Sequence, residues 1–244
     1  MRNSGESSSS SFTWNSLYKV GGIASLIIVA FMPLQMAVFV IWPPPSTITG
    51  WFALFEENTI VGLLDMDLLL IVDYVLLVVI FLALWSTLRK TSESFVTFAL
   101  ILQIVSAATY FSSATAFEML SLSNQYSAAT TDNQRTILLA SGHAMLANWQ
   151  GTAFNISYVL SGAALLTVSL VMKRSRPLYS RTVAFAGIGA GILSLVPSTA
   201  GQIGLVFSLI SLPPLALWLV LVAKALLKYS RVSQGSPTEA IWGD

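Results

Sequence analysis

Three aspartates lie within one apolar stretch of the chain, and they are the side chains best able to do chemistry. Asp65, Asp67 and Asp73 fall between residues 58 and 89, in a segment long and apolar enough to cross a bilayer. A carboxylate in hydrocarbon is costly, so it needs a partner, a proton or a function. At a rise of about 1.5 Å per residue, we expect Asp65 and Asp67 near the outer headgroups and Asp73 near the bilayer midplane.

Further polar residues in other apolar segments are expected to join Asp73. Four of them recur at steps of three and four, which places them on one helical face: Gln103, Ser106, Tyr110 and Ser113. We expect Gln103 at the depth of Asp73, and Asn155 and Glu118 nearer the outer face. The candidate ligand- or ion-binding residues are therefore Asp73, Gln103, Tyr110, Asp65, Glu118 and Asn155, around a polar pocket open to the outside.

Each of these residues also has a simpler interpretation. A carboxylate at the midplane could bind a cation or carry a proton. It could instead be neutral, or hydrogen-bonded to Gln103 or a tyrosine, and serve only to tie helices together. For Asp65, Asp67 and Glu118, ordinary solvation at the membrane interface is the simpler interpretation.

The composition is that of a membrane protein. Of 244 residues, 55% are hydrophobic and 9% charged, against a usual charged fraction of about a quarter. A soluble domain could not cover its surface with so few polar groups, so we expect the lipid bilayer as solvent. The net charge of +1 and the lack of a basic stripe argue against a nucleic-acid partner. The absence of cysteine excludes disulfides and thiolate metal sites.

The apolar pattern predicts an all-α polytopic membrane protein with six transmembrane helices, at residues 20–42, 60–88, 95–122, 151–172, 182–196 and 203–227. Residues 1–19 form a polar tail that we expect to be disordered, and residues 230–244 form a second polar tail, which leaves 20–229 as the transmembrane domain. Residues 49–57 and 132–149 are expected to be amphipathic segments along the outer membrane surface, with Trp51 at headgroup level.

The basic residues predict the orientation. With both termini in the cytoplasm, eleven of the twelve lysines and arginines fall on the inner side, and only Arg135 lies outside. We therefore expect an N-in, C-in protein.

Several membrane activities can be set aside, and no cofactor is expected. The one histidine, His143, cannot build a histidine-rich zinc or haem site within one chain. Every lysine lies at the end of a predicted span, so no Schiff base for retinal can form in mid-membrane. Small residues four apart, such as Gly187 and Gly191, favour close helix packing. Packing inside one chain is the simpler interpretation, although such faces could also support an oligomer.

Several motifs resemble those of an uncharacterised family of bacterial multi-pass membrane proteins, classed as a domain of unknown function. They are Gly62-Leu-Leu-Asp65-Met-Asp67-Leu-Leu, Tyr110-Phe-Ser-Ser, Phe117-Glu118-Met-Leu-Ser-Leu-Ser, Trp149-Gln-Gly-Thr-Ala-Phe154 and Val196-Pro-Ser-Thr-Ala-Gly201. The resemblance covers most of residues 15–230. It implies a bacterial inner-membrane location and no mechanism. It also gives more weight to Glu118 and to the turn at residues 149–152 than composition does.

These observations favour a binding or regulatory protein with an outward-facing polar pocket for a small molecule, a lipid or an ion. One alternative is a secondary transporter that uses Asp73 as its ion or proton site, with a kink at Pro213-Pro214. Another is a membrane-embedded hydrolase that uses Glu118, His143 and Asp65, which requires these side chains to lie within hydrogen-bond reach. A purely structural role predicts no polar cavity.

Overall fold

The computed structural model describes residues 6–175 and 178–232, and all regular structure in these ranges is α-helical. Along the described chain the helices are α1 (Glu6–Ile41), α2 (Ile48–Glu57), α3 (Thr59–Asp65), α4 (Leu68–Ser113), α5 (Ala116–Ala128), α6 (Asp132–Trp149), α7 (Thr152–Met172), α8 (Arg181–Leu193) and α9 (Gly201–Val232).

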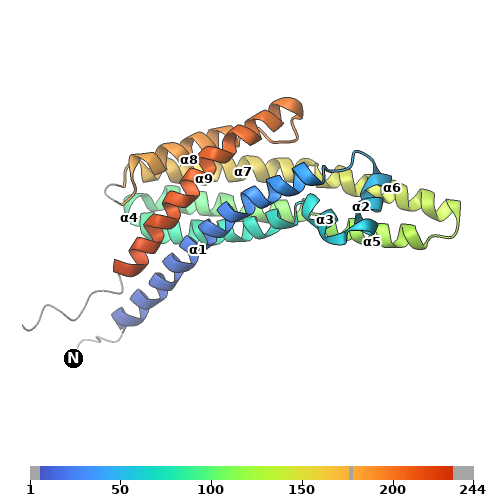
Figure 1. Cartoon of the computed structure of the whole chain (residues 1–244). Helices are drawn as coiled ribbons and strands as arrows, with labels where there is room; N and C mark the ends of the chain where they lie inside the picture. Colours follow the sequence, from blue (N-terminus) through green and yellow to red (C-terminus); the bar gives the residue numbers. More distant parts are fainter. Residues whose placement is uncertain (1–5, 176–177, 233–244) are drawn as a thin grey trace, which may run out of the picture.

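Helix α4 folds back on itself at Ser92, where the backbone leaves the helical conformation (φ −162°, ψ 88°). In a straight helix, residues 85 and 97 would lie about 18 Å apart. Instead, the Trp85 indole N–H donates to Thr97 Oγ1 at 2.9 Å. The reversal falls between the second and third predicted spans, residues 60–88 and 95–122. It divides α4 into two antiparallel arms, the first arm (68–91) and the second arm (93–113) (Figure 1).

Helices α1, α7, α8 and α9 pack with the two arms of α4 as one bundle (Figure 1). The start of α1 and the end of α9 lie together at one end, where the rings of Tyr18 and Tyr229 are 6.1 Å apart. Near the reversal of α4, the hydroxyls of Thr87 and Tyr179 are hydrogen-bonded at 2.9 Å, which ties the α7–α8 connection to the first arm. We call this the packed end of the bundle.

Within the described residues, four helical stretches are long and apolar enough to cross a membrane: Asn15–Ile41, Leu68–Ala128, Asp132–Met172 and Gly201–Arg231. The second of these contains the reversal of α4. Helix α8 has 13 residues and is about 20 Å long, which is shorter than a hydrocarbon core of about 30 Å. An all-helical fold of the described residues, with four helical stretches able to span a membrane, is therefore confirmed.

The end of the bundle opposite the packed end is covered by four short helices, α2, α3, α5 and α6, which we call the cap (Figure 1). Their apolar side chains form a core of their own, made of Ile48, Trp51, Phe52, Phe55, Met66, Ala116, Met119 and Trp149. The Ser123 hydroxyl donates to the Phe52 carbonyl at 2.8 Å and ties α5 to α2. Helix α6 starts with a capping box between Thr131 and Gln134.

At the packed end, small residues bring α8 close to its neighbours. A Cβ on Gly187 would collide with the Ser169 hydroxyl and the Trp218 indole, and one on Gly191 would lie 2.8 Å from the Leu166 nitrogen. Both glycines therefore face other helices of the same chain, as expected for packing inside the bundle. The surrounding apolar core includes Ala83, Leu84, Leu88, Val96, Ala164, Val168, Met172, Val183, Ala190, Leu219, Val222 and Leu226.

The second predicted span, residues 60–88, starts too early. The chain does not form one helix from residue 60, because α3 ends at Asp65 and α4 begins only at Leu68. Between them, Asp67 adopts the left-handed conformation with φ 62°, which no α-helix accommodates. Asp73 consequently lies in the second turn of α4 and not near the middle of a span.

The third predicted span is also shorter than expected. It was expected to stay helical to Leu122, but the second arm of α4 ends at Ser113. The helix stops because Ala114 adopts an extended conformation (φ −71°, ψ 112°), and α5 starts afresh at Ala116.

The segment expected to be a disordered tail is largely helical. Helix α1 begins at Glu6, and neither proline nor glycine interrupts the chain from there to Val20, so the long helix continues through the serine run. The remaining tail residues, 1–5 and 233–244, lie outside the described residues.

Helix α6 does not run across the direction of α7, as a segment along the membrane surface would (Figure 1). Helix α6 pairs with α5 in a hairpin that extends past the bundle, roughly in line with α7, from which only Gln150 and Gly151 separate it (Figure 1). Trp51 is 2% exposed, and its ring meets that of Trp149 edge-on at 5.7 Å. Packing within the cap therefore takes the place of the expected contact of Trp51 with headgroups.

Candidate functional site

A cavity of about 580 Å³ lies inside the bundle and reaches up to the cap. Its walls come from α1, the first arm of α4, α7 and α9, and Asp65, Asp67 and Asp73 all line it. The structure thus brings the three aspartates to one cavity. Much of the remaining wall is aromatic, from Phe31, Phe39, Tyr74, Phe81, Trp149, Phe154, Tyr158 and Trp218.

Asp65, the last residue of α3, is fully buried at the cap end of this cavity. Neither of its carboxylate oxygens has a hydrogen-bond partner. Gln35 of α1 lines the same cavity and donates through Nε2 to the Leu64 carbonyl at 3.0 Å, while its buried Oε1 also has no partner. Burial raises the pKa of Asp65 to about 6. Ordinary interfacial solvation is therefore wrong for Asp65, which is buried among protein atoms.

Asp67 connects the α3–α4 junction to the cap and to the second arm. Its Oδ2 accepts from the Trp149 indole N–H at 3.0 Å, and its carbonyl accepts from the Tyr110 hydroxyl at 3.3 Å. Burial raises the pKa of Asp67 to about 7; the Trp149 hydrogen bond lowers it, and the charge of Asp65 raises it further. The left-handed backbone of a non-glycine residue is a strained conformation of the kind that collects at functional sites.

Asp73 borders the cavity from the first arm of α4, and its Oδ1 is buried without a partner. The next residue, Tyr74, stacks on Tyr110 of the second arm with ring centroids 4.2 Å apart. The hydroxyls of Tyr74 and Ser157 are hydrogen-bonded at 3.2 Å, and Ser106 donates to the Ser157 carbonyl at 2.6 Å. This network holds the backbone beside Asp73 against α7.

Gln103 does not lie level with Asp73, so the expected pairing of the two is wrong. Because Tyr74 stacks on Tyr110, Gln103 lies about 10 Å farther from the cap than Asp73 does. The late start of α4, at Leu68, accounts for the difference, because it places Asp73 close to the cap. Gln103 is fully buried, and its Oε1 accepts from the Ser161 hydroxyl at 3.1 Å. It does not itself line the cavity, but Ser161 does.

The polar stripe on the second arm forms a single buried face, as its spacing predicts. All four of its members are buried: Gln103, Ser106, Tyr110 and Ser113. Tyr110 does not line the cavity. It contacts residues that do, by stacking on Tyr74 and by donating to the Asp67 carbonyl.

Asn155 positions the α8–α9 loop and does not line the cavity. Its Nδ2 donates to the Gly151 carbonyl at 2.9 Å, and its Oδ1 accepts from the Thr199 hydroxyl. Thr199 does line the cavity. Asn155 therefore fixes a loop that forms part of the wall.

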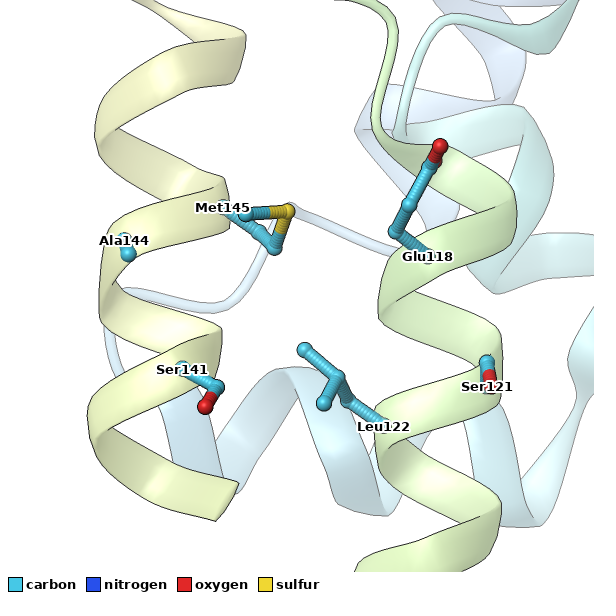
Figure 2. Close-up of a pocket in the computed structure, with 6 residues that line it drawn as sticks. All are labelled: Glu118, Ser121, Leu122, Ser141, Ala144 and Met145. Atoms are coloured by element: carbon cyan, nitrogen blue, oxygen red, sulfur yellow. The ribbon is translucent and has the colours of Figure 1, made fainter. Parts of the chain in front are cut away.

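Glu118 lies apart from the aspartates. It borders a separate groove of about 390 Å³ between α5 and α6, into which Leu122 and Met145 also point (Figure 2). Glu118 and His143 are exposed, whereas Asp65 is fully buried under the cap. No hydrogen bond joins any two of these three in the part of the chain described. The arrangement does not bring Glu118, His143 and Asp65 into one catalytic constellation.

Charge and spacing limit what the cavity can hold. Its lining contains no lysine, arginine or histidine. Among the described residues, no three His, Cys, Asp or Glu side chains gather closely enough to hold a metal ion. The cavity therefore offers separated acceptor oxygens on an otherwise apolar wall.

A family model supports the resemblance found in the sequence. Residues 20–226 match the model of the domain of unknown function DUF4386. The chain belongs to this family. The match takes in every helix that borders the cavity and the whole cap. No curated protein and no solved structure matches the chain.

Sequence reasoning left Gln35 and Trp149 out of the candidate site. Gln35 is polar within an apolar helix, which was the available signal, but only the fold brings its amide to the Leu64 carbonyl and into the same cavity as Asp65. In the sequence, Trp149 is indistinguishable from an ordinary interfacial tryptophan. Its hydrogen bond to Asp67 joins residues 82 apart in sequence, so no local pattern indicates it.

Proposed function

We propose that this protein binds a small ligand in the cavity beneath its cap. The observation that carries the proposal is Asp65, whose buried carboxylate borders the cavity and has no hydrogen-bond partner. Leaving a buried acceptor unsatisfied costs about 1–3 kcal/mol, and more when it is charged. A ligand that donates to it recovers that cost.

In this proposal the protein crosses a bacterial inner membrane six times, through α1, the two arms of α4, α7, α9, and residues 181–200. The last of these crossings combines α8 with the α8–α9 loop, because α8 alone is shorter than the hydrocarbon core. Both termini face the cytoplasm, because eleven of the twelve lysines and arginines then lie inside. The cap lies on the outer side.

Labelling of single cysteines tests the orientation, because the chain has no cysteine of its own. Ser127→Cys lies near the α5–α6 turn and Ser94→Cys near the reversal of α4, and both positions are exposed. A membrane-impermeant maleimide applied to intact cells labels Ser127→Cys and leaves Ser94→Cys unlabelled. Labelling of Ser94→Cys alone would indicate the opposite orientation, with the cap in the cytoplasm.

Entry of small molecules into the cavity can be tested in the same cysteine-free background. Ser211 lines the cavity, whereas Ser169 is equally buried but lies in the packed core. Aminoethyl methanethiosulfonate, a small thiol reagent, is expected to modify Ser211→Cys much faster than Ser169→Cys. Equal rates at the two positions would argue against a ligand cavity.

A second candidate function is proton-coupled transport through the same cavity. It is favoured by Pro213 and Pro214 inside α9, which interrupt its backbone hydrogen bonds next to the wall residues Leu212 and Leu215. A helix weakened there could change shape, with Asp73 carrying the proton. Asp73→Asn would then abolish proton-coupled uptake in vesicles without abolishing binding. Unchanged uptake of every solute that wild type transports would dispose of this candidate.

A further inference from the structure

We propose that the cavity selects an organic cation that joins a primary ammonium group to an apolar body. This inference rests on the proposed binding function and adds the chemical class of the ligand.

The unpartnered polar atoms at the cap end of the cavity are all acceptors. They are Asp65 Oδ1, Asp65 Oδ2, Gln35 Oε1 and Asp73 Oδ1, each buried without a hydrogen-bond partner, on side chains that line the cavity. A primary ammonium has three N–H donors and no acceptor, so it matches a region whose unpartnered polar atoms are acceptors. Hydrogen bonds between charged partners are about twice as strong as neutral ones.

The charge of the lining favours a cation over an anion or a neutral molecule. Asp65, Asp67 and Asp73 are its ionisable acids, and no lysine, arginine or histidine faces them across the cavity. Two indole N–H groups on the lining are neutral donors: that of Trp149, which donates to Asp67, and that of Trp218, which has no partner. An anionic ligand would meet like charge with no basic partner to offset it.

The shape of the site favours an organic cation over an inorganic one. A divalent cation such as calcium takes six to eight oxygen ligands at about 2.3–2.6 Å. The carboxylates of the described chain do not converge to that extent. A volume of about 580 Å³ lies instead within the range of about 300–1,000 Å³ that is usual for organic ligands.

The rest of the wall suits an apolar body. Phe31 and Phe39 of α1 face Tyr74 and Phe81 of α4 and Phe154 of α7 around the cavity. Aromatic faces also attract cations. A ligand with its ammonium beside Asp65 can therefore extend its apolar part along these rings.

Two sources could supply such a group: a free amine from solution, or the headgroup of phosphatidylethanolamine. Both present a primary ammonium on an apolar body. Nanodiscs made of phosphatidylcholine and phosphatidylglycerol, with or without added phosphatidylethanolamine, distinguish the two. If the added lipid weakens amine binding, the headgroup is the source; if it has no effect, the source is a soluble amine.

The test compares probes that share one body and differ in the polar group. They are 4-phenylbutylamine, 4-phenylbutanol, 4-phenylbutyrate and 4-phenylbutyl-trimethylammonium, titrated into the full-length protein in nanodiscs at pH 7.5, with empty nanodiscs subtracted. We expect the amine to bind at least about tenfold more tightly than the alcohol and the carboxylate. The quaternary probe keeps the charge but lacks N–H donors, so it should lie between the amine and the alcohol.

Asp65→Asn removes the charge and keeps the shape of the side chain. It should weaken amine binding at least about tenfold and alcohol binding much less, because the amide oxygen still accepts a hydrogen bond. A cooperative thermal unfolding transition shows that the variant is folded. Glu118→Gln is the matched control, because Glu118 is an acid outside the cavity. It should bind the amine as wild type does.

The outcomes separate this inference from the proposed function. If the alcohol or the carboxylate binds as tightly as the amine, or if Asp65→Asn binds the amine normally, the cavity is a binding site but the cation inference is wrong. If the quaternary probe matches the amine, the role of N–H donors is overturned. If no probe binds at millimolar concentration, the cation inference fails. The binding function itself then fails only if the Ser211→Cys and Ser169→Cys variants also react at equal rates.

Discussion

The packed end and the cap end of the bundle use the same helices in opposite ways. At the packed end, Gly187 and Gly191 let α8 sit against α7 and α9 with no room for a further methyl group. At the cap end, α1, α4, α7 and α9 separate around a cavity that contains Asp65, Asp67 and Asp73. Close packing needs only small and apolar residues, so the sequence of the packed end is accounted for by stability. Carboxylates around a cavity lower stability, and a ligand explains them best.

The largest effect is expected at the packed end, from Gly187→Ala. The added methyl group collides with the Ser169 hydroxyl and the rigid Trp218 indole, and overpacking of this kind costs about 1–3 kcal/mol. Gly189→Ala is the matched control two residues away, where a Cβ meets nothing within 4 Å. Thermal unfolding in nanodiscs should show a clearly lower midpoint for Gly187→Ala only. Equal midpoints would mean that the two ends do not differ in packing.

At the cap end, the sign of the effect should reverse. Asp65→Asn removes a buried, unpartnered carboxylate that is ionised at pH 7.5, because its pKa is about 6. We expect the unfolding midpoint of the ligand-free protein to rise by about 2–4 °C, which corresponds to about 1 kcal/mol. Glu118→Gln, on the exposed face of α5, should leave the midpoint unchanged. A lower midpoint for Asp65→Asn would mean that the carboxylate stabilises the fold.

The pH dependence sharpens the same contrast. Burial raises the pKa of Asp65 from 3.8 to about 6 and that of Asp67 from 3.8 to about 7. Between the unfolded and folded pKa values the folded state holds more protons. The contribution of these two carboxyls to stability is therefore greatest below about pH 4 and is lost as the pH rises to about 7. Amine binding should change in the opposite direction and strengthen as Asp65 ionises. In the double variant Asp65→Asn, Asp67→Asn, both stability and amine binding should depend much less on pH. If either pH dependence is unchanged, other groups cause it.

A smaller effect is expected from Trp149→Phe, which keeps the ring contact with Trp51 but removes the indole N–H that donates to Asp67. This hydrogen bond lowers the pKa of Asp67. Its loss should move the midpoint of the stability–pH curve upward by less than about one pH unit. An Asp67→Asn background is the control, since there the substitution should not move the midpoint. A downward shift would mean that the bond favours the protonated acid.

Most of the helices could be predicted from the sequence, since apolar runs and basic residues mark where long helices begin and end. The positions of α7, α8 and α9, and the reversal of α4 near Ser92, follow from such local signals. The left-handed Asp67 carries no local signal, and it sets the start of α4. That single residue displaced Asp73 from its expected depth and separated it from Gln103.

The candidate site was predicted in kind but not in detail. A costly acid within an apolar stretch pointed correctly to the region of Asp65, Asp67 and Asp73. Which of them is unpartnered depends on contacts between distant segments, such as Gln35 with Leu64 and Trp149 with Asp67. The motif residue Glu118 proved to belong to a different groove, because α5 projects away from the bundle.

The most direct test of the central claim is to fill the cavity. Ser211 lines it, and its hydroxyl bonds only its own helix, at the Ser208 carbonyl, so Ser211→Phe adds a ring without orphaning a distant partner. Ser112→Phe is the control, because Ser112 is exposed and also bonds its own helix. Titration of 4-phenylbutylamine into both variants in nanodiscs should show at least about a tenfold loss of affinity for Ser211→Phe and none for Ser112→Phe. Wild-type affinity in the filled variant would contradict the assignment of this cavity as the binding site.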